Sequence, residues 1–237
     1  MNKSSAIDKI RGKLSSGGYS IGSWMQIPHP SVAEIMGQGD YDWVAVDMEH
    51  GAVAVHQLPD LFRALELGET LPLARVAHGN PKDCKQALDA GACGIIAPMI
   101  DSSEQLIAVR DACQWPPAGT RGVGFSRANL FGKNFAEYRT EAQKPLLIAM
   151  IETRKAVANL NNILSVRGLD AVMIGPYDLS ASIGFTAEFD TKEFKLTIDS
   201  ILKGCKQHGI PCGVHVVMPS SEELNCRLDE GYRFIAY

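Results

Sequence analysis

Several apolar runs in this chain end in side chains that carry charge or titrate. The run W-V-A-V-D-M-E-H ends on Asp47, Glu49 and His50, L-P-L-A-R on Arg75, P-L-L-I-A-M-I-E on Glu152, and A-V-M-I-G-P-Y-D on Asp178. Short runs of this kind are typical of buried strands. If these strands are parallel neighbours, their carboxyl ends lie on one face. Two carboxylates, an arginine and a histidine on that face would suit a divalent metal and an anionic substrate.

Glu152 and Asp178 are the candidate metal ligands. Each follows an apolar run, and the two runs are consecutive along the chain. Carboxylate oxygens are the donors that Mg²⁺ and Mn²⁺ prefer, with further positions left for water. The alternative is a carboxylate at the start of a helix, where the helix dipole favours it. Thr153, itself a good helix cap, keeps that alternative open for Glu152.

Arg75 and His50 are the candidates for binding and proton transfer. A guanidinium at the end of an apolar strand must be paired. Arg75 would hold a carboxylate or a developing oxyanion, or it would form an ion pair with Asp47 or Glu49. His50 is either a general base tuned by a nearby carboxylate or a solvated loop histidine.

Two further residues stand out by position. Asp89 ends a helical pattern, where the helix dipole disfavours a carboxylate, and this points to a role in contacts. His215 lies inside the strand-like segment G-V-H-V-V. The alternation of a strand directs it either toward the inside of the sheet or toward the helices, and the sequence leaves both open.

Strand and helix patterns that alternate from end to end would position these residues. The predicted strands are Tyr19–Met25, Trp43–Met48, Leu71–Val76, Gly94–Met99, Leu146–Ile151, Ala171–Gly175, Gly213–Val217 and Arg233–Tyr237. The predicted helices are Ser31–Gly37, His56–Leu67, Pro81–Ala90, Glu104–Cys113, Thr153–Leu164, Thr191–His208 and Ser220–Asp229. Parallel neighbours need long crossovers, so eight such units predict a (β/α)8 TIM barrel. A doubly wound open sheet is the alternative, but no glycine-rich phosphate loop follows the first strand.

Composition narrows the class of protein. The chain has 237 residues, 46% of them hydrophobic and 21% charged, with a net charge of -4. This predicts one globular domain over residues 1–237. No basic patch points to nucleic acid, and no apolar run approaches the roughly 20 residues that span a bilayer. The six cysteines form no C-x-x-C pair, and we expect reduced thiols in a cytoplasmic protein.

Taken in order, a set of motifs resembles the HpcH/HpaI aldolase family. The motifs are D-M-E-H-G, the strand-end Arg75, A-L-D-A-G-A-C-G-I-I-A-P-M-I, P-P-A-G-T-R-G-V-G, M-I-E-T and V-M-I-G-P-Y-D-L-S-A-S-I-G. The resemblance runs from about Gly22 to the end of the chain. It implies a TIM barrel of the phosphoenolpyruvate/pyruvate type. It also implies a class II, metal-dependent pyruvate aldolase acting on 2-keto-3-deoxy sugar acids or 4-hydroxy-2-ketodioic acids.

The resemblance assigns roles around a pyruvate unit. Glu152 and Asp178 would ligate a divalent ion, Mg²⁺ with Mn²⁺ and Co²⁺ as alternatives, which would chelate the carboxylate and the 2-keto oxygen. Arg75 would hold the keto oxygen and stabilise the enolate formed when a 4-hydroxy-2-keto acid is cleaved to pyruvate and an aldehyde. The substrate-binding residues would be Arg75, Trp24, Gly175 and Pro176.

The acid/base group and the assembly also follow from the resemblance. His50 would be the acid/base with Asp47 close by, and Asp89 would be a partner contributed through subunit packing. The family assembles as a homo-oligomer, a trimer or hexamer that exchanges its last helix between subunits. No lysine stands at the matching strand ends, which disfavours a Schiff-base mechanism.

The sequence departs from the family at two places. Many members have glutamine two residues before the metal glutamate, where this chain has Met150, and a thioether is a poor Mg²⁺ ligand. The chain stops at Tyr237, so we expect a barrel without the usual final C-terminal helix. Two other functions stay open: an acyl-CoA lyase of a related barrel family, and a barrel that binds a keto acid without turning it over.

Overall fold

The computed structural model describes residues 1–218 and 220–237, and within them eight strands alternate with helices. The strands are β1 (Ser20–Met25), β2 (Trp43–Asp47), β3 (Leu71–Arg75), β4 (Gly94–Ala97), β5 (Leu146–Ile151), β6 (Ala171–Ile174), β7 (Cys212–His215) and β8 (Phe234–Ala236). The α-helices are α1 (Lys3–Ser15), α2 (Pro30–Gly37), α3 (Leu58–Leu67), α4 (Pro81–Ala90), α5 (Ser103–Cys113), α6 (Phe135–Glu141), α7 (Arg154–Ala158), α8 (Leu160–Leu164), α9 (Pro176–Ser182), α10 (Lys192–His208) and α11 (Ser221–Glu230). Two 3₁₀ turns, η1 (Val55–Gln57) and η2 (Arg127–Gly132), complete the order.

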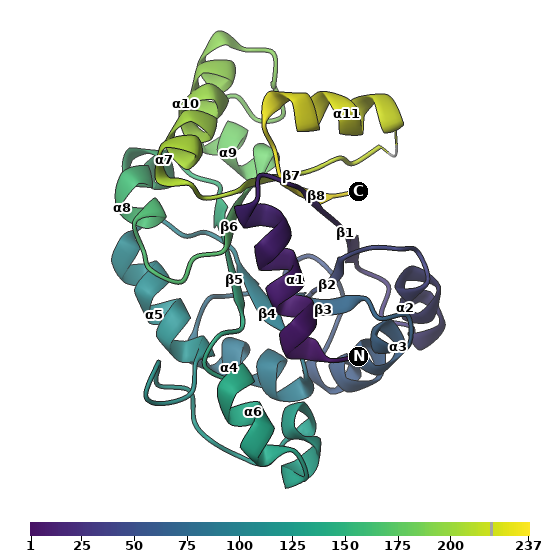
Figure 1. The fold of residues 1–237 in the computed structure, drawn as a ribbon. Helices are drawn as coiled ribbons and strands as arrows, with labels where there is room; N and C mark the ends of the chain where they lie inside the picture. Colours follow the sequence, from purple (N-terminus) through teal and green to yellow (C-terminus); the bar gives the residue numbers. More distant parts are fainter. Residues whose placement is uncertain (219) are drawn as a thin grey trace.

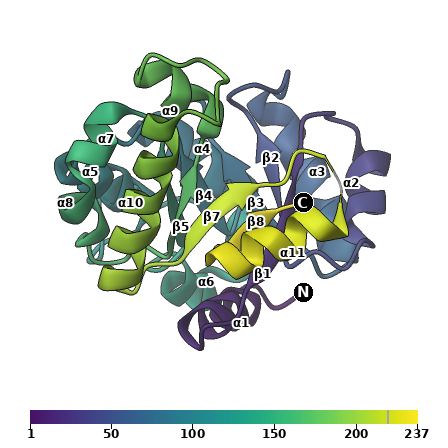
Figure 2. The ribbon, with the colours of Figure 1, turned by 90° about the horizontal axis from the view of Figure 1, so that it is seen from above.

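The strands close into one parallel barrel. Each strand pairs with the next along the chain, and β8 returns to pair with β1. The helices lie around the strands in both views of the ribbon (Figure 1, Figure 2). The structure therefore confirms the predicted (β/α)8 TIM barrel, and the open doubly wound alternative is wrong.

Side chains along each strand alternate between two cores, as the pleat of a strand requires. On β2, Trp43 and Ala45 belong to the core inside the barrel, whereas Val44 and Val46 pack against the helices. The same alternation turns the next residue, Asp47, inward at the carboxyl end. Strand-end residues in the inward phase therefore meet at one mouth of the barrel.

Helix α1 closes the opposite end of the barrel (Figure 1). Its buried residues are Ile7, Ile10 and Leu14, which join the inner core. Lys3 and Arg11 donate hydrogen bonds to the carbonyls of Gly91 and Pro145, which stand shortly before β4 and β5. In the inner core Trp43 stacks on Phe234, with ring centroids 4.4 Å apart. With this end covered, the barrel mouth at the carboxyl ends of the strands is the open end of the described barrel.

The segment predicted as helical over Thr153–Leu164 is helical in the structure, but it is not one continuous helix. The structure has two short helices instead, α7 and α8, which meet at Asn159 with φ -100° and ψ 10°. The Asn159 side chain donates a hydrogen bond to the carbonyl of Asp101. The backbone N–H of Asn159 still donates to the carbonyl of Lys155, so the two helices are separated by this single residue.

The other predicted elements agree with the structure to within a few residues. Leu146–Ile151 and Pro81–Ala90 match β5 and α4 at both ends. Three helices were not predicted, α1, α6 and α9; α9 follows β6 directly and begins with Pro176, where proline suits the first turn. No helix in the described part of the chain is both long and apolar enough to span a bilayer.

Candidate active site

The carboxyl ends of the strands surround a cavity of about 580 Å³, which we call the strand-end cavity. Its lining residues are Ser23, Trp24, Gln26, Ile27, His50, Arg75, Met150, Glu152, Met173, Ile174, Gly175, Pro176, Tyr177, Asp178 and His215. Seven of the nine residues that the sequence assigns to the site are therefore brought together: Trp24, His50, Arg75, Glu152, Gly175, Pro176 and Asp178. Of the remaining two, Asp47 lies just beneath the cavity and Asp89 lies elsewhere.

Asp47 and Arg75 form a buried, two-pronged ion pair beneath the cavity. They stand side by side in the register of β2 and β3. Arg75 donates from Nε to Oδ1 of Asp47 at 2.8 Å and from Nη2 to Oδ2 at 2.6 Å. Gln26 donates to Oδ2 as well, at 2.7 Å. Burial acts to raise the pKa of Asp47, but the hydrogen bonds from Arg75 and Gln26 outweigh it and the pKa is lowered.

The remaining nitrogen of Arg75 faces the cavity. Its Nη1 has a weak partner, the sulfur of Met150 at 4.0 Å. The guanidinium lies over the indole of Trp24, 4.4 Å from the ring centroid, which fixes its plane. Because Asp47 holds two of the nitrogens and Trp24 holds the plane, Nη1 is oriented to donate a hydrogen bond to a ligand oxygen.

Glu152 is a buried carboxylate at the end of β5, only 3% exposed. It does not cap the following helix, because Thr153 does so by accepting from the Ala156 backbone N–H. Instead Oε2 of Glu152 accepts from the backbone N–H of Met99 at 2.8 Å. Met99 has φ +54°, a left-handed conformation that costs energy for a residue with a side chain. The helix-start alternative for Glu152 is therefore wrong.

Gly175 makes room for this carboxylate. A Cβ at Gly175 would overlap the carboxyl group of Glu152, so the close approach requires glycine. Gly175 lies between β6 and α9, Pro176 begins α9, and Asp178 is in the first turn of that helix. The side chain of Asp178 faces the strand-end cavity, and its position also suits the dipole of α9.

Negative charge around the cavity exceeds positive charge. Burial raises the pKa of Glu49, and it raises the pKa of Glu152 to about 7, with Asp178 adding to both. Oε2 of Glu49 is buried without a hydrogen-bond partner in the described residues, 3.5 Å from Nε of Arg75. Arg75 already neutralises Asp47. A cation between Glu152 and Asp178 would therefore fit the charge of the site.

The carboxylates leave room for other ligands. No group of three or more His, Cys, Asp or Glu side chains among the described residues is placed to hold a metal ion. Mg²⁺ is commonly bound through one or two carboxylates, with water and substrate oxygens completing its six positions. The pair Glu152 and Asp178 corresponds to that arrangement.

The buried carboxyl of Glu152 makes the stability of the metal-free protein depend on pH. Its pKa is about 7 against an ordinary value of 4.5, so between these values the folded protein holds a proton that the unfolded chain releases. The stabilisation is complete below pH 4.5 and is lost as the pH rises through 7. The full change is on the order of 3 kcal/mol. Urea unfolding of the metal-free protein would test this. We expect the free energy of unfolding of the wild type to fall between pH 5 and pH 8 relative to that of Glu152→Gln. The same pH dependence in both proteins would contradict the prediction.

His50 stands at the rim of the cavity. Its side chain is 58% exposed, and Nε2 lies 3.8 Å from Oε2 of Glu49. Its backbone N–H donates to Oδ1 of Asp47, so the ion pair beneath also holds the loop that carries His50. The imidazole is therefore near a carboxylate and open to a ligand, as a general base requires.

Asp89 is not part of the strand-end cavity. It lies near the end of α4, where Oδ1 is 4.0 Å from Nη1 of the buried Arg121. Burial raises the pKa of Asp89, opposed by Arg121 and Lys85. Within one chain, Asp89 is therefore not brought together with His50.

Three residues of the site, Gln26, Met99 and Tyr177, were not predicted as members, and the orientation of a fourth, His215, was left open. Gln26 follows β1 directly, so the strand-end rule could have found it. Met99 acts through its backbone, which no residue type reveals. Tyr177 and His215 line the cavity, and the structure turns His215 inward, because its neighbours Val214 and Val216 belong to the outer core.

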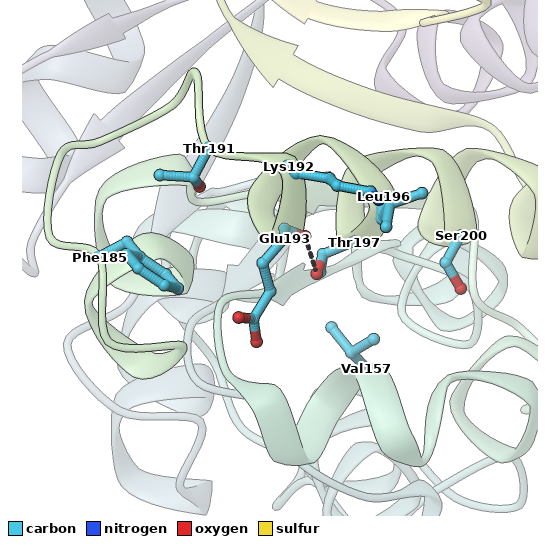
Figure 3. Close-up of a pocket in the computed structure, with 8 residues that line it drawn as sticks. All are labelled: Val157, Phe185, Thr191, Lys192, Glu193, Leu196, Thr197 and Ser200. Carbon is cyan, nitrogen blue, oxygen red and sulfur yellow. Dashed lines mark hydrogen bonds between the residues drawn. The ribbon is translucent and has the colours of Figure 1, made fainter.

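A second hollow, of about 610 Å³, lies in the helix layer (Figure 3). Val157 of α7 faces Leu196 and Thr197 of α10 across it. The hydroxyl of Thr197 donates to the backbone carbonyl of Glu193, one turn earlier in the same helix. None of the nine predicted site residues is among the described residues that line this hollow.

Comparisons with known proteins find relatives that match nearly the whole chain. The hydroxypyruvate/pyruvate aldolase of Roseobacter denitrificans (strain ATCC 33942 / OCh 114) is 34% identical over 232 residues, covering 97% of this chain and 90% of the relative. The 4-hydroxy-2-oxovalerate aldolase of Novosphingobium aromaticivorans is 36% identical over 238 residues, covering 97% of this chain and 87% of the relative.

A solved structure shows the same fold. An HpcH/HpaI aldolase/citrate lyase family protein from Burkholderia cenocepacia J2315 superposes with a TM-score of 0.89 at 26% identity, covering 96% of this chain and 91% of that one. The sequence model of the HpcH/HpaI aldolase/citrate lyase family matches residues 20–237. With strands, cavity and strand-end residues all included in that match, the chain belongs to the HpcH/HpaI aldolase/citrate lyase family.

Proposed function

We propose that this protein is a class II aldolase that cleaves a 4-hydroxy-2-keto acid to pyruvate and an aldehyde with the help of a divalent metal. The observation that carries the proposal is the meeting of Glu152, Asp178 and the free nitrogen of Arg75 around one cavity. Relatives named as aldolases of hydroxy-keto acids support the substrate class. Mg²⁺ is the ion we favour, with Mn²⁺ and Co²⁺ as alternatives, because the donors are carboxylates.

Each residue has a defined task in this reaction. The bond between C3 and C4 of the substrate breaks, its electron pair stays on C3, and the C4 hydroxyl loses its proton, so that the aldehyde forms. His50, exposed at the rim, takes that proton as general base, and C3 of the enolate then takes up a proton to give pyruvate. Nη1 of Arg75 donates to the C2 oxygen, where negative charge develops. A divalent ion at Glu152 and Asp178 would polarise the same oxygen and offset its charge.

The described residues that line the cavity include no lysine, which supports this mechanism over a Schiff base. Trp24, Gly175 and Pro176 would contact the pyruvate half of the substrate. Asp89 would assist His50 only across a contact between subunits, because within one chain it lies outside the cavity. We propose a homo-oligomer, a trimer or hexamer, as the family resemblance implies, that acts on small molecules in the cytoplasm, where its cysteines stay reduced.

Pyruvate release tests the proposal. We expect pyruvate to form when the protein meets a 4-hydroxy-2-keto acid with Mg²⁺, Mn²⁺ or Co²⁺, and EDTA to reduce the rate at least about a hundredfold. A coupled lactate dehydrogenase assay across sugar-acid and dioic-acid substrates would measure it. Activity that survives EDTA would exclude the metal, and pyruvate binding without turnover of any substrate would favour the non-catalytic barrel.

A further inference from the structure

His215 occupies the point where the strand-end cavity opens into a second space. It ends β7 and packs edge-on against Trp24, with ring centroids 6.3 Å apart. It lines the strand-end cavity together with Arg75 and Glu152. It also lines an adjoining groove of about 1040 Å³ between α10 and α11, which shares Pro176 and Tyr177 with the cavity. A substrate whose pyruvate half faces Arg75 would extend past His215 into this groove.

The imidazole of His215 is available to a ligand. No hydrogen bond among residues 1–218 and 220–237 involves its ring, and its nitrogens are not among the buried atoms sealed from solvent. Burial lowers the pKa of His215, and the nearby charge of Arg75 lowers it further. The ring is therefore neutral at pH 7, with one nitrogen that donates and one that accepts.

The walls of the groove disfavour a negative ligand. Its charged lining residues are Asp190, Asp199, Glu223 and Glu230 against Lys195 and Arg227. Lys195 pairs with Asp190, and Arg227 pairs with Glu223 and Glu230, so no cation remains free among them. A neutral hydroxyl, which both donates and accepts, suits this entrance better than a carboxylate.

We infer that His215 selects the aldehyde partner by hydrogen-bonding a hydroxyl on the carbon next to the aldehyde carbon. The inference rests on the proposed aldolase function and deepens it: the aldehyde half is a neutral 2-hydroxyaldehyde, and the cleaved keto acid carries a hydroxyl on C5. Arg75, Glu152 and Asp178 act on the pyruvate half of the substrate, whereas His215 contacts the aldehyde half.

A matched pair of aldehydes tests this assignment. Glycolaldehyde and propionaldehyde have the same number of heavy atoms and differ by a hydroxyl in place of a methyl group. We expect the wild-type protein to add pyruvate to glycolaldehyde with a kcat/KM about tenfold higher, the effect of one hydrogen bond between uncharged groups. In His215→Leu this ratio should fall to about one. His215→Gln, which keeps a donor and an acceptor, should restore most of the ratio.

Two controls separate selectivity from damage to the fold or to catalysis. His208→Leu changes a histidine near the end of α10 that bonds to Asn161 outside both spaces, and it should keep the wild-type ratio. Exchange of the C3 hydrogens of pyruvate in D₂O, followed by NMR, reports on the pyruvate half without any aldehyde. In His215→Leu it should change less than the kcat/KM for glycolaldehyde.

The outcomes are distinguishable. A glycolaldehyde preference that survives in His215→Leu would overturn the inference, and so would an equal loss for both aldehydes and for pyruvate exchange. A wild-type protein that shows no pyruvate exchange with any of the three metals would contradict the proposed aldolase itself. Exchange in wild type with no preference between the aldehydes would overturn the His215 assignment alone.

Discussion

Replacing Arg75 by methionine is expected to remove both activity and a large part of the stability. Asp47 is fully buried, and Arg75 supplies two of its hydrogen bonds. Without the guanidinium a buried carboxylate is left unpaired, which costs about 3–5 kcal/mol of unfolding free energy. The lost donor at the C2 oxygen should lower kcat about 10²- to 10³-fold. Urea unfolding and the pyruvate assay would measure the two effects.

A double variant separates these two roles of Arg75. In Asp47→Asn/Arg75→Met the buried charge is gone as well, so most of the stability should return while the activity does not. Arg63→Met, at an exposed arginine of α3, is the matched control and should change neither. Recovery of activity in the double variant would show that Arg75 acts only by balancing Asp47.

Glu152→Gln is expected to abolish metal binding and catalysis without harming the fold. Glutamine has the shape of glutamate, so its carbonyl oxygen can still accept from the Met99 N–H beside Gly175. The loss of one negative charge removes a ligand that Mg²⁺ or Mn²⁺ needs. Pyruvate release should fall about 10³-fold or more, the scale of losing the main electrostatic stabiliser.

Calorimetric titration with Mn²⁺ would measure the loss of binding directly. Glu137→Gln removes the same charge from an exposed position on α6 and should bind Mn²⁺ like wild type. Full Mn²⁺ affinity in Glu152→Gln would mean that the ion, if it acts, is held elsewhere. Retained activity with lost binding would instead exclude the metal from the mechanism.

The alternation of apolar runs and helical patterns predicted the barrel because each strand and each helix is set by its own local sequence. Each strand is a short apolar run, and each connection is long enough to cross over to a parallel neighbour. The differences are three helices that the pattern did not predict, α1, α6 and α9, and a break in the segment predicted as one helix. That break is at Asn159, whose side chain donates to the carbonyl of Asp101, between α7 and α8.

The sequence predicted those site residues that follow from their place at the end of a strand. Arg75 and Glu152 end their strands in the inward phase, so both had to reach the same mouth once the barrel closed. The alternatives left open for Arg75 proved compatible: it is paired with Asp47 and still presents Nη1 to the cavity. The role of Asp89 as a partner of His50 stays a prediction, because it requires a contact with a second subunit.

The sequence by itself determined which residues end the strands, and so which charges the barrel mouth receives. Only the tertiary structure decided how those charges are held: the backbone N–H of Met99 against Glu152, the space that Gly175 leaves, and Gln26 against Asp47. The tertiary structure also decided the inward orientation of His215 and the groove beside it. The reason is physical, since residue type and spacing set each strand locally, whereas these contacts join segments that are distant in sequence and meet only when the barrel closes.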